Sequence, residues 1–484
     1  MTIAPLVKSV RLSTVLGGDV RLEASTYLRD GYGFIRLANQ CDNHKRLGDL
    51  ADIWQPSRLT GYTVPEGKGL PFFTAGQVFE DFPRVRKWLA APFVPQADSR
   101  FVKQDWLLLS RSGVVGNVTA VYPHHVNKVI TDDLLRIEPK DQDEYGWLYA
   151  YMKTDFFKQI ARASQYGHMI KHIEVAHANE FPVIMPDAAT RKAIGDKAAK
   201  AVRLRGEAWK LRDEAFKLLE KEVGIACEAE SPAGTCVVSL SKVIDNRSRL
   251  DADSYAGSIS AVDSLVDAME YAPLAELVED VEELPRFKRF YGDSDVPFVG
   301  VSEVFDVNAQ PTKFVYAKLI KNWERYILKP GTLVMACSGQ KYGILGRALL
   351  LTENHEGMFG SNHLLRIYPD VTKIRTGYLL AFLNSPTVGR PSVVRCAYGT
   401  SVPQLSPIDI KNIRVPRLGA DDESAIADLM DRSVSTSAKA DRLENEATKL
   451  AQEQIDIAIE RLSQTPKRPI ECLASHALGI QAQR

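Results

Sequence analysis

Leu134-Leu135-Arg136-Ile137 returns unchanged as Leu364-Leu365-Arg366-Ile367, a shift of 230 residues (364 − 134). Other short matches surround this repeat in the same order: Pro71-Phe72 and Pro297-Phe298, Ser112-Gly113 and Ser338-Gly339, Tyr166-Gly167 and Tyr398-Gly399. The shift varies only between 226 (297 − 71) and 232 (398 − 166), as short loop insertions would produce. The sequence therefore predicts two copies of one domain, related by an approximate two-fold axis.

The composition is that of an ordinary globular protein, with 484 residues, 45% hydrophobic and 25% charged. Its 61 Lys and Arg residues balance 61 Asp and Glu residues, so the formal net charge is zero. This balance argues against a protein that binds nucleic acid tightly by charge alone. It is compatible with a DNA reader inside a complex whose other subunits contact the phosphates.

The cysteines and the apolar runs bear on the compartment. None of the six cysteines forms a C-x-x-C pair, which predicts reduced thiols and no zinc site. The first residues lack a charged-then-apolar leader, and no run of 18 apolar residues occurs. We therefore expect a cytoplasmic protein that does not span a membrane.

Each half shows the same predicted order of elements. A short amphipathic segment, Leu47–Leu50 or Leu274–Leu277, precedes apolar strands that stop at Gly turns, and a helical stretch and a proline-closed strand follow. Mixed short strands and helices predict an α/β (α+β) fold in each half. The predicted domains are 1–186 (first globular domain, with an N-terminal segment 1–46), 187–224 (first long helix), 225–416 (linker and second globular domain), 417–464 (second long helix) and 465–484 (C-terminal tail).

The two long helices carry the sharpest local pattern. The first begins near Asp187, a good N-cap, and ends at Gly224, while the second begins near Asp421. Small and large residues alternate at a spacing of three to four, which lets two helices approach along a narrow seam. We expect an antiparallel coiled-coil spacer that holds the globular domains at opposite ends; alternatively, each helix folds back on its own domain. The predicted seam is Ile194, Ala201, Leu204, Ala208, Leu211, Ala215 and Leu218, with Ile426, Leu429, Ser433, Ala440, Leu443, Ala447, Leu450 and Ile457.

Signs of an active site are few. The chain has no G-x-x-x-x-G-K-[ST] loop, no Asn-Pro-Pro-aromatic motif, no G-x-S-x-G elbow and no H-E-x-x-H. We expect no catalytic residues, no bound cofactor and no metal. His168 and His172 lie four apart, but a metal would need a third ligand, and the second half has no histidines at the corresponding place. A ligand-contacting surface is the better interpretation of this pair.

The two halves share framework residues and differ in the polar residues between them. Arg and Lys contact guanine and phosphates, whereas Asn and Gln contact adenine, so a shared frame with different polar loops suits two domains that read two different sequences. The candidate DNA-contacting residues are Arg111, Asn117, His124, His125, Lys128, His168 and Lys171 in the first half, and Lys341, Tyr342, Arg347, Asn362, His363, Arg395 and Tyr398 in the second.

This plan resembles the DNA-specificity subunits of type I restriction–modification systems. The resemblance covers nearly the whole chain and rests on an ordered set of features. These are the Leu47-Gly48-Asp49-Leu50 opening, the Pro-Phe segments, the stretch from Gly399 to Pro416 and a long helix after each domain.

The resemblance implies a role without catalysis. Each globular part would be a target-recognition domain for one half of a bipartite site in double-stranded DNA. The helices would dock two adenine methyltransferase subunits, which bring S-adenosylmethionine, and a motor–nuclease subunit can join them in this family. Two alternatives stay open: a self-sufficient DNA-modifying enzyme with unrecognised motifs, and a duplicated protein-binding scaffold of a related anti-phage defence system.

Overall fold

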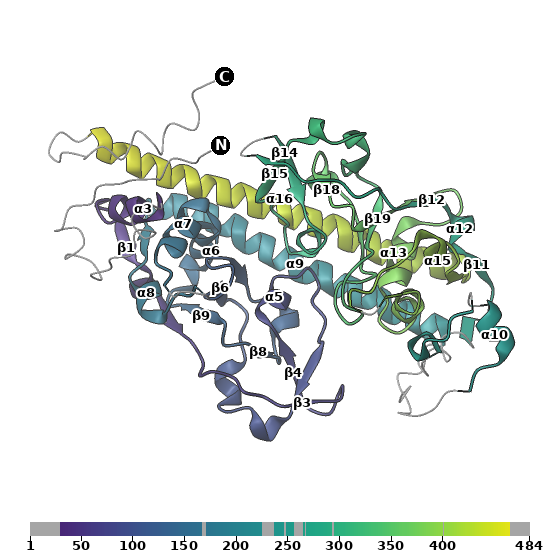
Figure 1. Ribbon diagram of the computed structural model, residues 1–484. Coiled ribbons are helices and arrows are strands. Elements are labelled where there is room, and N and C mark those ends of the chain that lie inside the picture. Colours follow the sequence, from purple (N-terminus) through teal and green to yellow (C-terminus); the bar gives the residue numbers. More distant parts are fainter. Residues whose placement is uncertain are drawn as a thin grey trace. The chain divides into compact units, whose positions relative to one another are not determined.

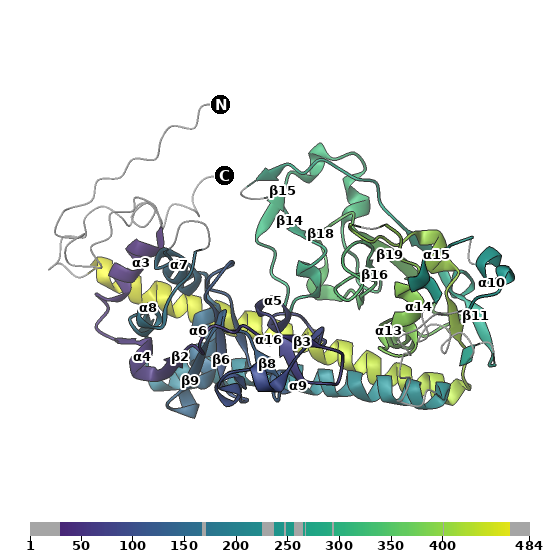
Figure 2. The ribbon, with the colours of Figure 1, turned by 60° about the horizontal axis from the view of Figure 1, so that its bottom comes forward.

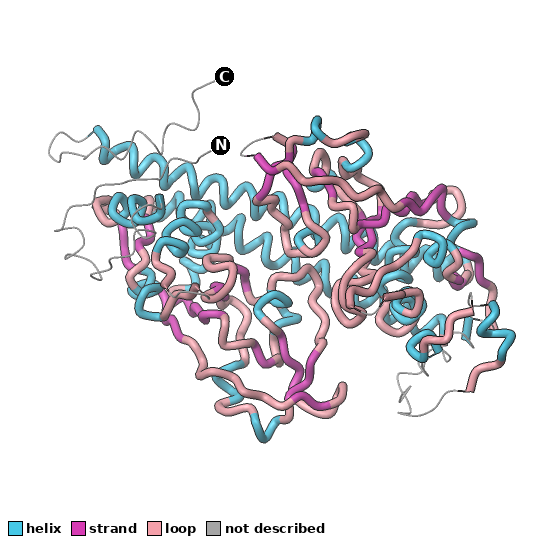
Figure 3. Tube along the Cα trace, in the orientation of Figure 1, coloured by secondary structure: helices cyan, strands magenta, loops and turns pink. Residues whose placement is uncertain are grey.

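The computed structural model describes residues 30–166, 171–224, 237–245, 248–255, 265–266, 268–292, 295–399 and 401–464. The chain divides into two compact units. Unit 1 comprises residues 1–79, 83–203 and 442–484, and unit 2 comprises residues 80–82 and 204–441. Short strands, short helices and two long helices make up both units, which confirms the mixed α/β class (Figure 3).

Unit 1 contains two four-stranded sheets and one strand pair (Figure 1). The first sheet is antiparallel, in the order β2 (Ala51–Trp54), β9 (Leu134–Pro139), β6 (Leu107–Ser110), β7 (Val118–Ala120). The second has the order β3 (Thr63–Val64), β5 (Lys87–Leu89), β4 (Leu70–Phe73), β8 (Val129–Ile130), with β4 and β8 parallel. Strand β1 (His44–Arg46) pairs with β10 (Pro182–Ile184).

Unit 2 has the same sheets in the same strand order. Its first sheet runs β12 (Val278–Glu282), β19 (Leu364–Pro369), β16 (Leu333–Ala336), β17 (Ala348–Leu350), and its second runs β13 (Tyr291–Gly292), β15 (Lys313–Val315), β14 (Val296–Val299), β18 (Phe359–Gly360). Strand β11 (Tyr271–Pro273) pairs with β20 (Arg414–Pro416). The registers agree as well, since Leu107 faces Ile137 and Leu333 faces Ile367.

Helices flank these sheets. Unit 1 has α3 (Asp30–Ala38), α4 (Leu47–Leu50), α5 (Ala75–Val78), α6 (Tyr145–Lys153), α7 (Asp155–Ala163) and α8 (Val175–Asn179). Unit 2 has α10 (Leu240–Asp245), α12 (Leu274–Leu277), α13 (Thr376–Asn384), α14 (Gly389–Val394) and α15 (Pro407–Lys411). The long helices α9 (Ala188–Val223) and α16 (Ala420–Gln464) each contribute one stretch to each unit.

The repeated Leu-Leu-Arg-Ile segment is framework. Its apolar residues are buried in β9 and β19, and its arginine is buried as well. In unit 1 the Arg136 guanidinium donates to the carbonyls of Thr131 (2.8 Å) and Ile130 (2.7 Å). Arg366 donates to the Leu364 carbonyl at 3.0 Å. Burial lowers the pKa of both guanidinium groups. Because both side chains donate to main-chain carbonyls inside the fold, they are not available to a ligand.

The predicted helix signals agree with the structure. The Asp187 carboxylate accepts the Thr190 amide at 2.9 Å, as expected of the residue that caps α9. Gly224 follows the helix with a φ of 78°, a conformation that glycine adopts without strain. The second helix begins at Ala420, one residue before Asp421.

Within each unit a stretch of α9 lies beside a stretch of α16 (Figures 1 and 2). In unit 2, Arg205 pairs with Asp441, and the Ser433 hydroxyl donates to the Ala208 carbonyl at 2.7 Å. Residues later in α9 contact residues earlier in α16, so the two helices are antiparallel, as predicted. In unit 1, Lys197 pairs with Glu446 at 2.7 Å.

One column of the predicted seam is buried throughout. It consists of Ile194, Ala201, Ala208 and Ala215 on α9, and Ile426, Ser433, Ala440 and Ala447 on α16. The second predicted column differs: Leu211 is buried, Leu204, Leu218, Leu429, Leu443 and Leu450 are half-buried, and Ile457 is exposed. The residues that come one position after the half-buried leucines are buried instead, namely Arg205 and Leu219 on α9 and Met430, Glu444 and Ala451 on α16.

This displacement has a physical cause, because the helices also pack against the globular parts. In unit 1, a Cβ atom added at Gly146 of α6 would overlap the Gly195 carbonyl of α9. In unit 2, one added at Gly377 of α13 would lie 2.6 Å from the Ala427 carbonyl of α16. Each long helix therefore packs on its own domain as well as beside the other helix. The packing of the long helices side by side and the packing of each helix on its own domain thus occur together.

Candidate nucleic-acid interface

The loop that leaves β6 in unit 1 pairs with a second loop that follows α7. Ser112 forms a β-bridge with His172, and His172 forms another with Tyr166. The amides of Tyr166 and His172 donate to each other's carbonyls at 3.0 and 2.9 Å. Arg111 Nε donates to the Ile173 carbonyl at 3.0 Å, and Lys171 beside it is half-buried. These two predicted residues thus belong to one loop pair, whereas His168 lies outside the described residues.

Unit 2 repeats this loop pair with different side chains. Ser338 and Tyr398 each form a β-bridge with Gln404. The amides of Tyr398 and Gln404 donate to each other's carbonyls at 2.9 and 2.8 Å. The position held by His172 in unit 1 is thus held by Gln404, inside the same hydrogen-bonded frame.

An open groove of about 1010 Å³ borders this loop pair in unit 2. Three predicted residues line it: Lys341, Tyr342 and Tyr398. The rings of Tyr342 and Tyr398 are 71% and 47% exposed, so they present flat apolar surface to a ligand. The groove is lined by Arg249, Asp251, Gln340, Lys341, Tyr342, Ala397, Tyr398, Gly399, Pro403, Ser406 and Asp409.

Arg249 fixes one wall of this groove. Its guanidinium pairs with Asp251 at 2.7 Å and donates to the carbonyls of Arg395 (2.9 Å) and Ala397 (2.6 Å). The hydrogen bond from Arg249, which outweighs partial desolvation, lowers the pKa of Asp251 to about 2. The predicted residue Arg395 is half-buried and offers its carbonyl to this wall.

His363 connects the loop pair to a basic segment of unit 2. Its Nδ1 lies 3.1 Å from the Ser338 hydroxyl. Partial burial, followed by the charges of Arg289 and Arg286, lowers the pKa of His363. The imidazole is therefore neutral at pH 7 and can donate or accept a hydrogen bond. Its neighbour Asn362, also a predicted contact, is buried.

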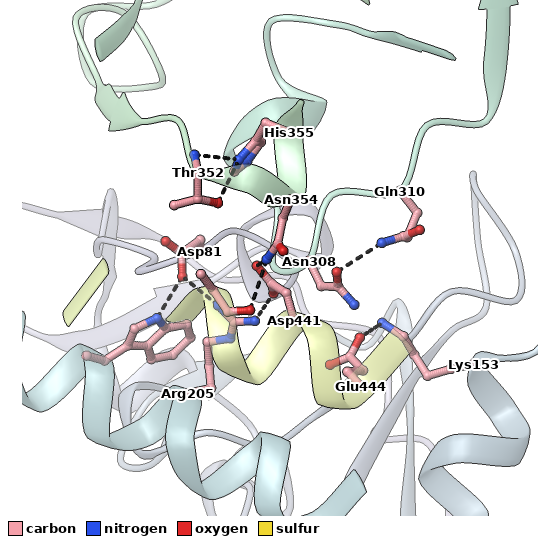
Figure 4. Close-up of polar contacts among 12 residues, drawn as sticks. Asp81, Lys153, Arg205, Asn308, Gln310, Thr352, Asn354, His355, Asp441 and Glu444 are labelled. Atoms are coloured by element: carbon pink, nitrogen blue, oxygen red, sulfur yellow. Dashed lines mark hydrogen bonds and ion pairs between the residues drawn. The ribbon is translucent and has the colours of Figure 1, made fainter. Parts of the chain in front are cut away.

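His125 is a core residue and not a surface contact. Its Nδ1 accepts the Tyr122 amide at 3.2 Å, and burial lowers its pKa to about 3. His355 accepts the Thr352 amide at 3.2 Å in the corresponding turn of unit 2 (Figure 4). His125 and His355 are separated by the repeat shift of 230 residues (355 − 125). A histidine kept at the same place in both halves indicates a structural residue of the fold and not one that distinguishes the two halves.

Arg347 takes part in a polar cluster within unit 2. Its guanidinium donates to Glu80 at 2.7 Å and lies 5.1 Å from the ring centre of Phe305. Beside it, the Asp81 carboxylate (labelled in Figure 4) accepts the Trp209 indole N–H at 2.8 Å. It also accepts a guanidinium N–H of Arg212 at 3.1 Å. The Arg347 guanidinium is held by these contacts inside the fold. Its role is therefore structural, and Arg347 is not a candidate DNA contact.

Two residues of the predicted set surround the core histidine turn of unit 1. Lys128 lies 5.8 Å from the ring centre of Phe73, and its ammonium donates to the Val126 carbonyl at 3.4 Å. His124 is half-buried. Asn117 lies at the end of the β6–β7 loop, where its amide donates to the Ser110 hydroxyl at 2.9 Å and its side chain is half-exposed.

One basic segment escaped the sequence reasoning. Arg286-Phe287-Lys288-Arg289-Phe290-Tyr291 alternates basic and aromatic residues, and all three cations are exposed. Because nucleic acid offers phosphates and flat bases, this alternation was a usable signal. The candidates predicted in the second half all lie between Lys341 and Tyr398, so this segment was missed.

In the part of the chain that the structure describes, no three His, Cys, Asp or Glu side chains gather in a group that could hold a metal ion. The described cysteines Cys41, Cys337 and Cys396 are free thiols, and burial raises their pKa values. No described helix is long and apolar enough to cross a membrane.

Comparisons with known proteins give structural similarity only. No protein-family model matches the chain, and no curated protein matches it. The structure resembles a type I restriction–modification S subunit from M. genitalium, at 15% identity and a TM-score of 0.27, over 87% of this chain and 95% of that one.

Two further solved structures give similar figures. The HsdS subunit from Thermoanaerobacter tengcongensis matches at 14% identity and a TM-score of 0.26, over 86% of this chain and 96% of that one. A structure from work on complex assembly and conformational transition of the type I R-M system matches at 13% identity and a TM-score of 0.27, over 86% and 97%. TM-scores of this size do not assign a function.

Proposed function

We propose that the chain is the DNA-specificity subunit of a type I restriction–modification system or of a related defence system. One observation carries the proposal: units 1 and 2 share strand order, register and loop pairing, yet differ in the polar residues on the loops. His172 and Gln404 occupy the same bridge position in the two units. Two equivalent frames with different side chains suit a target made of two different half-sites.

In this proposal each globular domain contacts one half-site. The candidate contacts are residues that differ between the units and have side chains at least partly exposed: Arg111, Asn117, His124, Lys128, Lys171 and His172 in unit 1, and Lys341, Tyr342, His363, Arg395 and Tyr398 in unit 2. His168 stays a prediction. Exposed tyrosines and half-exposed amides and cations can contact base edges and phosphates.

The long helices act as the spacer in this proposal. Their antiparallel packing and their small-residue column support this role, and a helix of the 45 residues of α16 is about 68 Å long at about 1.5 Å per residue. The helices also dock two methyltransferase subunits, which bring S-adenosylmethionine and the catalytic motifs that this sequence lacks, and a motor–nuclease subunit joins where the system restricts DNA.

The test is reconstitution. The full chain is purified with and without a candidate adenine methyltransferase subunit from the same genome, and methyl transfer from S-adenosylmethionine to duplex DNA is measured. The proposal expects methylation only when both are present, at a bipartite sequence. Methyl transfer by the chain alone would favour the self-sufficient enzyme. Binding to the methyltransferase with unchanged mobility of every duplex would favour the scaffold.

A further inference from the structure

The basic segment 286–291 lies in a loop that has an equal counterpart in unit 1. Residues 283–290 join β12 to β13, and residues 55–62 join β2 to β3. Equivalent hydrogen bonds fix the alignment, because the Ala90 amide donates to the Tyr62 carbonyl at 2.9 Å and the Tyr316 amide donates to the Phe290 carbonyl at 2.9 Å. The two loops can therefore be compared residue by residue.

The apolar side of the unit 2 loop is anchored in the core. The Tyr326 hydroxyl donates to the Pro285 carbonyl at 2.8 Å. The Phe287 ring packs edge-on against Tyr326 (4.9 Å between ring centres) and Phe359 (5.2 Å). Together with the Phe290–Tyr316 bond, these contacts hold the backbone of the loop at both ends and in the middle.

The polar side of the loop presents cations to solvent. Arg286, Lys288 and Arg289 are exposed, and none of them forms an ion pair with any residue that the structure describes. Arg289 lies 5.4 Å from the ring centre of Phe298, and Lys288 lies 5.3 Å from that of Phe290. Contact with a ring face restricts each cation while leaving its N–H groups free to bind an anion.

The turn beside this loop adds two more exposed cations, Lys318 and Lys321. Tyr316, whose amide binds the loop, immediately precedes the 3₁₀ turn Ala317–Leu319 that contains Lys318. Acidic side chains lie nearby as well: Glu282 pairs with Arg325, Asp295 accepts the Ala317 amide at 3.0 Å, and Glu283 and Glu324 are exposed. The five exposed cations named above outnumber the three exposed acids, Glu283, Asp295 and Glu324.

Unit 1 lacks this charge at the matched positions. At a shift of 228 (290 − 62), Arg286 corresponds to Arg58, whereas Lys288 and Arg289 correspond to Thr60 and Gly61. At a shift of 226 (316 − 90), Lys318 and Lys321 correspond to Pro92 and Pro95. Five exposed cations in unit 2 thus correspond to one in unit 1, so the duplication has diverged in charge as well as in its loops.

We propose that Arg286, Lys288 and Arg289 form a phosphate-binding ridge for duplex DNA that has no equal at the matched positions of unit 1. This inference rests on the proposed function and deepens it: unit 2 supplies the larger part of the sequence-independent affinity. The ridge continues the candidate interface, because Arg286 and Arg289 act electrostatically on His363, which contacts Ser338 of the loop pair. A pre-formed cationic ridge binds phosphates with little loss of side-chain entropy.

The test measures the salt dependence of binding. The full chain, in complex with its methyltransferase, binds a fluorescein-labelled random-sequence duplex between about 50 and about 200 mM NaCl. Replacing Arg286, Lys288 and Arg289 by Gln is expected to reduce the slope of log affinity against log salt by about two to three, since each phosphate contact contributes about 0.9. Affinities for target and non-target duplexes should fall by the same factor.

Two variants serve as controls. R58Q in unit 1 removes the one matched cation and is expected to change the slope by about one at most. The charge-conserving variant R286K/K288R/R289K should keep the slope of the wild type. An unchanged slope in the triple Gln variant, or an equal loss in the charge-conserving variant, would overturn the ridge while leaving the proposed function intact. A wild-type complex that binds no duplex at any salt would overturn both.

Discussion

The Ser433 hydroxyl donates to the Ala208 carbonyl at 2.7 Å, and this bond joins the two long helices inside unit 2. A side chain as short as serine reaches the main chain of the other helix only where the two helices lie very close. Both residues are fully buried, so no room is left for a larger side chain. Small side chains are therefore as important as apolar ones for the packing of this seam.

Ser433→Leu should destabilise the protein through overpacking of this seam. The expected decrease in the free energy of unfolding is about 1 to 3 kcal/mol. Ser435 provides the matched control, because it lies two residues away on the same helix and is exposed. Ser435→Leu should change stability by less than about 0.5 kcal/mol. Chemical denaturation measures both, and equal effects would contradict the close-packed seam.

Glu444 is a buried carboxylate that binds Lys153 at 2.8 Å and the Tyr149 hydroxyl at 2.8 Å, all within unit 1. Glu444→Ala would leave the Lys153 ammonium without its counter-charge in a largely buried site, at a cost of about 3 to 5 kcal/mol. Asp196→Ala, which breaks an exposed pair with Lys192, should cost at most about 1 kcal/mol. Urea unfolding measures the stability of both variants. An effect of Glu444→Ala as small as that of Asp196→Ala would contradict this, because it would show that water solvates the Lys153 ammonium in the variant.

Asp81 makes stability depend on acid pH. Burial raises the pKa of its carboxyl, but the charges of Arg212 and Arg205 and the Trp209 hydrogen bond outweigh burial and lower it from 3.8 to about 2. A folded-state pKa below the unfolded value adds stability that is fully present above pH 4 and is lost as the pH falls towards 2. Asp81→Asn should lower the melting temperature at pH 7 and flatten the pH dependence between pH 4 and pH 2. Parallel acid-induced transitions in the wild type and the variant would contradict this role.

The groove of unit 2 should determine one half-site only. Replacing Lys341 and Tyr342 by Ala removes an amine and an exposed ring from the groove and should weaken binding to the cognate target by about 1 to 3 kcal/mol for each of the two that touches a base. Selection of bound duplexes from a random pool reads the preference at both half-sites. We expect relaxation at one half-site and an unchanged sequence at the other. A change at both half-sites, or at neither, would remove the groove from the DNA interface.

Much of the fold was predictable because the chain repeats itself. Asp187 and Gly224 marked the first long helix to within a residue, since capping is a local property of the backbone. The column through Ala208 and Ser433 was also predictable from helical spacing. The second column was not, because the globular domains pack on the same helices, and that packing depends on contacts distant in sequence, such as Gly146 against Gly195.

The candidate site was less predictable than the frame. Residue type alone could not separate the half-exposed His124 from the buried His125, nor show that Glu80 would bind Arg347. Comparison of the halves would have helped, because His125 and His355 are preserved as framework. The basic segment was missed for a different reason. Its alternation of basic and aromatic residues is visible in the sequence, but the packing of Phe287 against Tyr326, with the cations left exposed, is seen only in the folded loop.

The most direct test of the account is removal of one heptad from each long helix. Deleting residues 198–204 of α9 and 437–443 of α16 keeps the seam in phase, because a heptad returns each column to the same face. The target of the wild-type and shortened complexes is then determined from the adenines that they methylate. The account predicts unchanged half-site sequences separated by a different number of base pairs. Altered half-sites at an unchanged separation would contradict it.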